Sequence, residues 1–398
     1  MPWWLLFFSL ALGIYGGVNF FLFWKIRLAF PQAGWWQLLP AVFLLLMVAG
    51  PFLVGFWMRA GLFRSARVLA AVAYPWMALI LWLFLALLAA DLWNLGARLA
   101  GLRFAGAERL LIAPRAALLA AGALAAVLGA WSSWEARHVR LHRVVVRSPR
   151  LAPGAAPITI AQISDVHLDL LTGPGFLDRV GAAIREARPD LIVSTGDLID
   201  TNADYGDGLT ARLAALEAPL GKFAIFGNHE YYAGEDFTRR FLAASGFRLL
   251  RGESAEAAAG RLRLVGIDDP AGQQMHHRAA GAPEPVPAPG EDQLLPAAGE
   301  RRELIVMLKH RPVVAAGSAG RFDLQLSGHT HGGQVFPFGL AVRCFFPLWA
   351  GLHRLPEGSW AYVSRGTGTW GPPMRLLAPP EVALIVIEPA GPKALHPF

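Results

Sequence analysis

Four apolar stretches without a charged residue occupy the first third of this 398-residue chain. Each is long enough to cross the hydrocarbon core of a bilayer, which takes roughly 20 predominantly apolar residues. A backbone in lipid must satisfy its own hydrogen bonds, so isolated stretches of this kind can cross only as helices. The predicted spans run from Trp3 to Trp24, from Leu28 to Met58, from Val68 to Ala90 and from Ala116 to Trp134.

The placement of tryptophan supports this interpretation. Eleven of the 14 tryptophans lie in or beside these stretches, many at their ends, as in the aromatic belts of membrane proteins. The fourth stretch is rich in Ala and Gly, and the alternative is a buried helix of a soluble domain, which would leave three spans. A secretory signal fits the first stretch poorly, because it lacks a basic leader and further spans follow. We therefore expect an all-α transmembrane domain of about four helices over residues 1–134.

The net charge of +7 also belongs to this first third. Nine of the 36 Lys and Arg residues and two of the 29 Asp and Glu residues precede residue 135, so the rest of the chain is neutral. Basic residues beside membrane spans serve topology or bind anionic lipid. A nucleic-acid partner is therefore not supported.

Residues 135–156 read as a basic, then Pro/Gly/Ala-rich juxtamembrane linker to a second domain over residues 157–398. With the N-terminus inside, the cytoplasmic flanks would hold eight basic residues against six on the other side. The positive-inside rule then favours, by this narrow margin, a cytoplasmic second domain. Because Cys344 is the single cysteine of the sequence, no intrachain disulfide can form, which weakly favours a reducing compartment.

Short β-rich runs alternate with helical patterns from Ile158 onward, which indicates an α/β domain. Polar motifs follow the ends of the predicted strands, where the active sites of α/β folds form. Five motifs at such positions predict one shared site. They are Asp165-Val166-His167, Gly196-Asp197-Leu198-Ile199-Asp200, Gly227-Asn228-His229-Glu230, Lys309-His310 and Gly328-His329-Thr330-His331-Gly332-Gly333.

These motifs offer carboxylate, amide and imidazole groups without a thiolate, a set that suits Mn, Fe, Co or Zn. A single histidine is more often structural than a ligand, but seven such groups at strand ends are enough for two divalent ions. Two ions about 3.5–4 Å apart can clamp the attacking and leaving oxygens of a phosphoryl displacement. The candidate metal ligands are Asp165, His167, Asp197, Asn228, His310, His329 and His331.

Two further residues have predicted catalytic roles. A water bridging the metals would be the nucleophile, and His229 is placed to protonate the leaving oxygen or to stabilise transition-state charge. Asp200 could orient a ligand histidine. Glu230 is better explained as a support of the ligands than as a general base.

The order of the five motifs closely resembles that of the calcineurin-like metallophosphoesterase superfamily. Gly332-Gly333-Gln334, Val265–Asp269 and Tyr362–Gly366 are similar to its bacterial membrane-associated, YkuE/YaeI-like branch. The resemblance covers roughly residues 157–390 and implies a four-layer αββα sandwich. It also implies one metal held by Asp165, His167, Asp197 and His331, and a second held by Asp197, Asn228, His310 and His329.

The resemblance implies a metal-dependent hydrolase of phosphodiesters, phosphomonoesters or pyrophosphates, in a bacterial inner or cell membrane. The membrane domain favours, weakly, a lipid-linked substrate. The alternative is a membrane sensor or transporter with a regulatory phosphoesterase domain, although spans without charged residues argue against a transport pathway. A nuclease would need a basic face that the neutral second domain lacks. Neither the oligomeric state nor the identity of the metals follows from the sequence.

Overall fold

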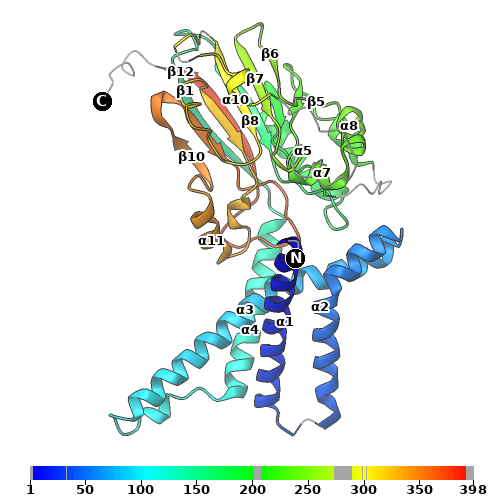
Figure 1. Cartoon of the computed structure of the whole chain (residues 1–398), viewed down its shortest axis with the longest axis vertical. Coiled ribbons are helices and arrows are strands. Elements are labelled where there is room, and N and C mark those ends of the chain that lie inside the picture. The colour runs from blue at the N-terminus through cyan, green and yellow to red at the C-terminus, as the bar shows by residue number, and fades with distance from the viewer. Residues whose placement is uncertain are drawn as a thin grey trace. The chain divides into compact units, whose positions relative to one another are not determined.

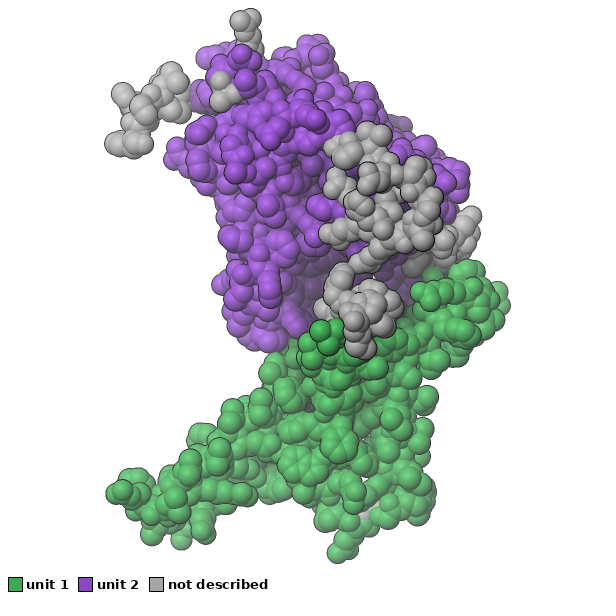
Figure 2. Space-filling view, viewed as in Figure 1, with its two compact units in different colours: residues 1–134, 371–374 green, residues 135–370, 375–398 purple. Residues whose placement is uncertain are grey.

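The structure is a computed structural model that describes residues 3–32, 34–200, 208–272, 289–297, 299–301 and 303–390 (Figure 1). The chain divides into two compact units, which are coloured separately in Figure 2. One unit comprises Met1–Trp134 with Gly371–Met374, and the other comprises Glu135–Trp370 with Arg375–Phe398.

The first unit is helical. Within the described residues, four helices are long and apolar enough to cross a membrane, as the apolar stretches predict. The α-helices are α1 (Trp3–Ala29), α2 (Leu38–Arg59), α3 (Phe63–Gly101) and α4 (Pro114–Ala136), and the 3-10 helices between them are η1 (Gly34–Gln37) and η2 (Ala107–Leu110).

Two of the predicted spans differ substantially from the helices of the structure. The stretch from Leu28 to Met58 is not one helix, because α1 ends at Ala29 and α2 begins at Leu38. Pro31 disfavours helical backbone in the residue before it, and Gly34 has a left-handed φ of 51°.

The third helix is longer than predicted. The 39 residues of α3 extend beyond Ala90 and include Asp91, which forms an ion pair with Lys25 of α1. An α-helix of that length measures roughly 58 Å, about twice the hydrocarbon thickness, so its ends have room for charged residues.

The second unit contains two six-stranded mixed sheets within its described residues. The strand order of the first sheet is β1-β12-β2-β3-β4-β5, and that of the second is β10-β11-β9-β8-β7-β6. The first sheet consists of β1 (Arg140–Ser148), β12 (Glu381–Pro389), β2 (Ile158–Ile163), β3 (Leu191–Ser194), β4 (Lys222–Ala224) and β5 (Arg248–Leu249). The second consists of β10 (Gly351–Arg354), β11 (Trp360–Val363), β9 (Leu324–Ser327), β8 (Leu304–Lys309), β7 (Leu262–Ile267) and β6 (Glu253–Ala257).

Strand β1 lies in the segment that the sequence interpretation assigns to a linker. It pairs in parallel with β12, from Arg140 opposite Glu381 to Ser148 opposite Pro389. Val144 and Val146 are buried, while Val145 between them and Arg143 and Arg147 beside them are exposed. The basic residues therefore lie on the solvent side of an edge strand, along which buried and exposed side chains alternate.

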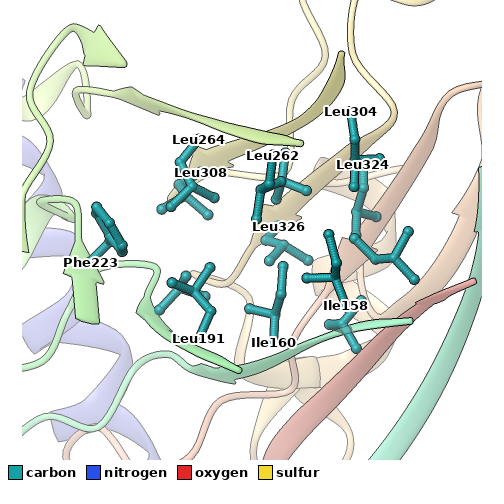
Figure 3. Close-up of a cluster of buried hydrophobic side chains, with 14 of the residues drawn as sticks. Ile158, Ile160, Leu191, Phe223, Leu262, Leu264, Leu304, Leu308, Leu324 and Leu326 are labelled. Atoms are coloured by element: carbon teal, nitrogen blue, oxygen red, sulfur yellow. The ribbon is translucent and has the colours of Figure 1, made fainter. Parts of the chain in front are cut away.

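The two sheets pack face to face through a shared apolar core (Figure 3). Ile158, Ile160 and Leu191 of the first sheet contribute to it, together with Leu304 and Leu326 of the second. Alternate residues of the same strands point to the other face of each sheet, because successive side chains of a strand alternate.

Helices cover the outer face of the first sheet, where Leu177, Leu213 and Leu242 pack with Ile163 and Ile192. The outer face of the second sheet is covered by a smaller cluster that includes Leu295 and Phe322. The layers agree with the predicted α/β sandwich. The helices of this unit are α5 (Pro174–Ala187), α6 (Leu209–Ala214), α7 (Asn228–Ala233), α8 (Glu235–Ala244), α10 (Glu291–Leu294) and α11 (Phe338–Phe345), with the 3-10 helices η3 (His331–Gly333) and η4 (Pro356–Gly358).

Candidate metal centre

The candidate ligands follow the carboxyl ends of five strands. Asp165 comes after β2, Asp197 after β3, Asn228 after β4, His310 after β8 and His329 after β9. Strands β2, β3 and β4 are parallel neighbours in one sheet, and β8 and β9 are parallel neighbours in the other. Parallel neighbours end at the same edge of a sheet, and face-to-face packing brings these two edges together.

Five of the candidate ligands have left-handed backbone conformations, although none is a glycine. Such a conformation costs a non-glycine residue roughly 1–3 kcal/mol and persists where surrounding contacts enforce it. Here the loops hold one another, since Asp165 N donates to Gly196 O at 3.0 Å and His167 N donates to Asp197 O at 3.0 Å. The five φ angles are 52° at Asp165, 47° at His167, 53° at Asp197, 71° at His329 and 51° at His331.

Two glycines permit this close approach. A Cβ on Gly227 would lie 2.2 Å from Asp197 Oδ1, and a Cβ on Gly328 would lie 1.9 Å from Ser164 Oγ and 2.1 Å from Asp165 Oδ2. These distances are far below van der Waals contact. No larger residue fits at either position without moving a ligand loop.

One group of ligand atoms gathers around His167. Its Nε2 lies 3.0 Å from His331 Nε2 and 3.8 Å from Asp197 Oδ2. His331 Nε2 is also 3.5 Å from Asp165 Oδ1. The ligand atoms of Asp165, His167 and His331 lie within 4.8 Å of one another, which is close enough to share one ion.

A second group gathers around His310. Its Nε2 lies 3.2 Å from Asp197 Oδ2 and 3.1 Å from His329 Nδ1. Its Nδ1 lies 2.9 Å from Thr195 O, which can accept only if Nδ1 carries the hydrogen. In the neutral ring, Nε2 then presents a lone pair to the group, as second-sphere carbonyls arrange for metal-ligating histidines.

The residues present fit divalent metal ions. The Oδ1 atom of Asn228 is buried without a hydrogen-bond partner among the described residues, which is unusual for an amide oxygen unless a ligand completes it. In each imidazole pair two ring nitrogens face each other at 3.0 or 3.1 Å, so a proton or a metal cation must lie between them. Asn, His and Asp donors together suit first-row divalent ions.

Carboxylates raise the pKa of one histidine in each pair. Burial disfavours the charged form of His310, but Asp197 outweighs it and raises the pKa of this imidazole to about 10. Burial likewise opposes protonation of His167, while Asp200 and then Asp197 raise its pKa to about 9.

The other histidine of each pair is neutral. Burial, followed by the charge of His310, lowers the pKa of His329 to about 3. Burial and then His167 lower the pKa of His331 well below its usual range. Each pair thus holds one proton in the metal-free protein, and a divalent cation would replace it.

His229 and Asp200 adjoin the centre. His229 Nδ1 is hydrogen-bonded to Asp200 Oδ1, and the same oxygen is 3.3 Å from His167 Nδ1. The backbone N–H of His229 donates to Asp197 Oδ1 at 2.9 Å. Burial opposes ionisation of Asp200, but hydrogen bonds from both histidines hold its pKa below the usual range. Asp200 therefore orients both rings at once.

Glu230 joins two of the ligand loops. Its Oε2 accepts N–H groups of Asp197 at 2.8 Å and Gly227 at 2.7 Å, and its Oε1 accepts those of Leu198 at 2.7 Å and Ile199 at 3.4 Å. Burial and the charge of Asp197 raise the pKa of Glu230 to about 7, and the backbone donors oppose that rise. With both oxygens engaged by the backbone, Glu230 supports the centre rather than meeting substrate.

Arg375 is the main residue that the sequence interpretation missed. Its guanidinium is fully buried and donates to the carbonyl oxygens of Arg365 at 2.6 Å, Ala378 at 3.0 Å and His331 at 3.2 Å. Its Nη2 also lies 3.3 Å from His331 Nδ1. The one signal in the sequence is an arginine inside the apolar run Met374–Leu377, which indicates a buried cation.

Arg365 forms an ion pair with Glu381. Its Nη1 donates to Glu381 Oε2 at 2.7 Å. The nine predicted site residues, by contrast, all lie in one place: seven in the two metal groups and beside them, and His229 with Asp200 at their edge.

A two-sheet α/β unit with paired Asp/His groups at its strand ends defines a metal-dependent phosphoester hydrolase. The calcineurin-like phosphoesterase family profile matches residues 158–333. An uncharacterized metallophosphoesterase of Aquifex aeolicus is 36% identical over 269 residues, which cover 67% of this chain and 99% of that protein. YkuE of Bacillus subtilis, an uncharacterized metallophosphoesterase, is 30% identical over 68% of this chain and 93% of its own length. The chain belongs to the calcineurin-like metallophosphoesterase family, in its YkuE-like branch.

A bovine transmembrane protein with metallophosphoesterase domain is 31% identical over 61% of this chain. The match spans only 55% of the bovine protein, and a Campylobacter jejuni relative is likewise matched over 59% of its length. Among solved structures, a putative 5'-nucleotidase of Staphylococcus aureus aligns over 61% of this chain and 56% of its own, at 13% identity and a TM-score of 0.35. The chain has four helices long and apolar enough to cross a membrane among its described residues, and it is similar to a transmembrane relative. It is therefore a membrane-associated member of the family.

Proposed function

We propose that the protein is a membrane-anchored, dinuclear metal-dependent phosphoesterase. One ion would be held by Asp165, His167, Asp197 and His331, and the other by Asp197, Asn228, His310 and His329. The observation that carries the proposal is the position of Asp197 Oδ2, 3.8 Å from His167 Nε2 and 3.2 Å from His310 Nε2. A carboxylate between two ligand groups is the natural bridge of a two-metal site.

When bound, the ions would lower the pKa of a bridging water to supply a hydroxide nucleophile and would neutralise charge on the phosphoryl oxygens. The protein's own contribution begins with His229, whose side chain reaches the surface of the site at 13% exposure. Asp200 accepts from His229 Nδ1, which leaves Nε2 to give a proton to the departing oxygen. Because Asp200 also engages His167, the proton donor and one ligand share a fixed orientation.

The substrate is a phosphodiester, a phosphomonoester or a pyrophosphate, and a lipid-linked substrate accords with the helices of the first unit. Manganese, iron, cobalt and zinc all suit the donor set. The helices of residues 1–134 form the anchor, and the catalytic domain begins near Glu135 rather than at residue 157, since β1 belongs to its sheet. The likeness to the YkuE-like branch supports a bacterial cell membrane, and the excess of flanking basic residues supports a cytoplasmic catalytic domain.

A sensor or transporter with a regulatory phosphoesterase domain is the second candidate, and the ion pair between Lys25 and Asp91 favours it. Charged residues in membrane helices are often functional. In the same two helices, Asn19 of α1 is buried and accepts from Trp76 Nε1 of α3 at 2.9 Å. If the helices only anchor the enzyme, Asp91→Asn leaves hydrolysis in vesicles unchanged; a change in turnover there, but not in detergent, would favour the regulatory function.

The deciding experiment uses detergent-purified protein stripped of metal and then supplied with Mn, Fe, Co, Zn or Mg in turn. Bis-p-nitrophenyl phosphate and p-nitrophenyl phosphate are assayed beside Asp197→Asn. We expect a transition metal to restore hydrolysis, Asp197→Asn to abolish it, and the preferred ester to separate diesterase from monoesterase. Two bound metals per chain in the wild type, measured by elemental analysis, would support the dinuclear site; one would refute it.

A further inference from the structure

Helix α11, Phe338–Phe345, presents large apolar side chains to solvent next to the candidate metal centre. Each of its eight residues is exposed or half-buried. Phe338 is 55% exposed, Leu340 56% and Phe345 78%. A helix that packs on its own domain buries a stripe of such residues, so the exposed apolar side chains of α11 need another environment.

The helix is attached directly to the last metal motif. A Cβ on Gly333 would lie 2.2 Å from Gly339 Cα, so the start of α11 is in contact with η3, which begins at His331. After the helix, the ring of Phe346 lies 5.4 Å from that of His329. Whatever contacts α11 is therefore close to two candidate ligands.

A second exposed aromatic residue connects α11 to the proton donor. Trp370 is 55% exposed, and its ring lies 5.7 Å from that of His229. Gln334, between η3 and α11, fixes it with two hydrogen bonds: Trp370 N donates to Gln334 Oε1 at 2.9 Å, and Gln334 Nε2 donates to Trp370 O at 3.0 Å. Exposed apolar groups thus border the metal centre on two sides.

The charge of this segment is uniformly basic. Residues 330–355 contain no Asp or Glu and include Arg343 and Arg354. The guanidinium of Arg343 lies 4.1 Å from the ring centre of Trp349 in a cation–π contact, and Trp is a residue type enriched at the level of lipid headgroups. Phe and Leu with Arg on a short amphipathic helix are the features of a segment that lies in the membrane interface.

A lipid bilayer is the partner most readily available to α11, because the same chain contains membrane-spanning candidates. It contains four helices able to cross a membrane, and three residues separate Ala136, at the end of α4, from Arg140, at the start of β1. Such a connection spans at most about 14 Å, or four steps between consecutive Cα atoms. A bilayer is thus always within reach of the catalytic unit, while a separate protein partner would have to be recruited.

We propose that α11 is a lipid-docking helix, which inserts Phe338, Leu340 and Phe345 into the headgroup region of an anionic bilayer. The docked helix brings the metal centre to phosphate groups at the membrane surface. If the proposed function holds, the substrate is then a phosphoester carried by a lipid, with its headgroup passing between α11 and Trp370.

The single cysteine of the chain, Cys344, is exposed on α11 and provides a site-specific probe. The full-length protein, labelled there with bimane, is reconstituted in phosphatidylcholine/phosphatidylglycerol vesicles containing lipids with a nitroxide near the headgroup. The matched control is Cys344→Ser with Glu186→Cys, which moves the label to an exposed position on α5. We expect quenching several-fold stronger at residue 344 than at residue 186.

Equal quenching at the two positions, whether strong or absent, would overturn the proposal. A second comparison uses Phe345→Glu and Val313→Glu, each with the label at Cys344. Val313 is also exposed, at 50%, but lies outside α11. Phe345→Glu should reduce quenching several-fold and Val313→Glu should not; no reduction in Phe345→Glu would contradict insertion of that side chain.

Hydrolysis of the soluble diester in detergent separates this proposal from the proposed function. Phe345→Glu should retain it, which shows that the variant is folded with an intact centre. If the wild type hydrolyses no ester with any metal, the proposed function fails, while the quenching still tests α11. If the variants hydrolyse the soluble ester and the label at residue 344 is not quenched, only the proposal that α11 docks to lipid is refuted.

Discussion

The carboxylate of Glu230 offers a quantitative test of how the centre is held together. Its two oxygens accept four backbone N–H groups, those of Asp197, Leu198, Ile199 and Gly227. In Glu230→Gln, one oxygen becomes an NH₂ group, which can only donate. Whichever way the amide is turned, two backbone N–H groups lose their acceptor and face another donor.

The expected cost follows from these two groups. A buried donor without an acceptor costs about 1–3 kcal/mol, so the substitution should destabilise the catalytic unit by about 2–6 kcal/mol. For a domain of this size, 1 kcal/mol corresponds to roughly 2–4 °C in Tm, so a decrease of roughly 4–24 °C is expected. Since the bonds join the loops of Asp197 and Asn228, metal affinity should fall as well.

The assay is thermal unfolding of the detergent-purified, metal-free protein, followed by metal titration. Glu186→Gln is the matched control, because Glu186 is exposed on α5 and should leave Tm within about 1 °C, as surface substitutions do. A Tm of Glu230→Gln equal to that of Glu186→Gln would refute the reasoning. Loss of turnover at saturating metal, with Tm and metal affinity unchanged, would instead assign Glu230 a direct catalytic role.

Three further predictions concern the centre. Gly328→Ala should lower both Tm and metal content, because its Cβ would lie 1.9 Å from Ser164 Oγ; normal metal content by elemental analysis would contradict this. His229→Asn should retain both metals but lose about 10²–10⁴-fold in kcat, as expected for loss of a general acid; wild-type kcat would exclude that role. In the metal-free protein the pKa values of His167 and His310 are raised to about 9 and 10, so their protonated forms stabilise the folded state. This stabilisation is fully present below the unfolded-state pKa of about 6.5 and is lost as the pH rises through 9–10. The Tm of the metal-free protein should therefore fall between pH 7 and 10, and His310→Gln should flatten that fall; an equally steep fall in His310→Gln would show that another group is responsible.

Much of the fold could be predicted because its signals are local. Runs of about 20 apolar residues can satisfy their backbones in lipid only as helices, so the transmembrane unit followed from composition. The strands β2, β3, β8 and β9 are short β-branched or leucine-rich runs that end just before a polar motif. Each is followed by one of the five polar motifs, as the sequence predicts.

The motifs of the candidate site could also be predicted, because each is a short pattern in the sequence. Asp165, Asp197 and His310 each follow a strand directly, and the ends of parallel strands converge whatever the details of packing. The interpretation failed where an assignment depended on a distant partner. Arg140–Ser148 carries many arginines, and it becomes a strand only because β12, more than 200 residues later, supplies the pairing groups.

What the sequence by itself determined is therefore the membrane helices, the α/β class and the set of groups able to bind metal. Only the tertiary structure decided that Arg375 is buried against the His331 loop, that Glu230 spans two loops, and that α11 leaves its phenylalanines exposed. Helix and strand formation depend on neighbours within a few residues, which sequence periodicity records. The environment of a buried charge or an exposed apolar face depends on side chains brought together from distant parts of the chain, and periodicity contains no information about them.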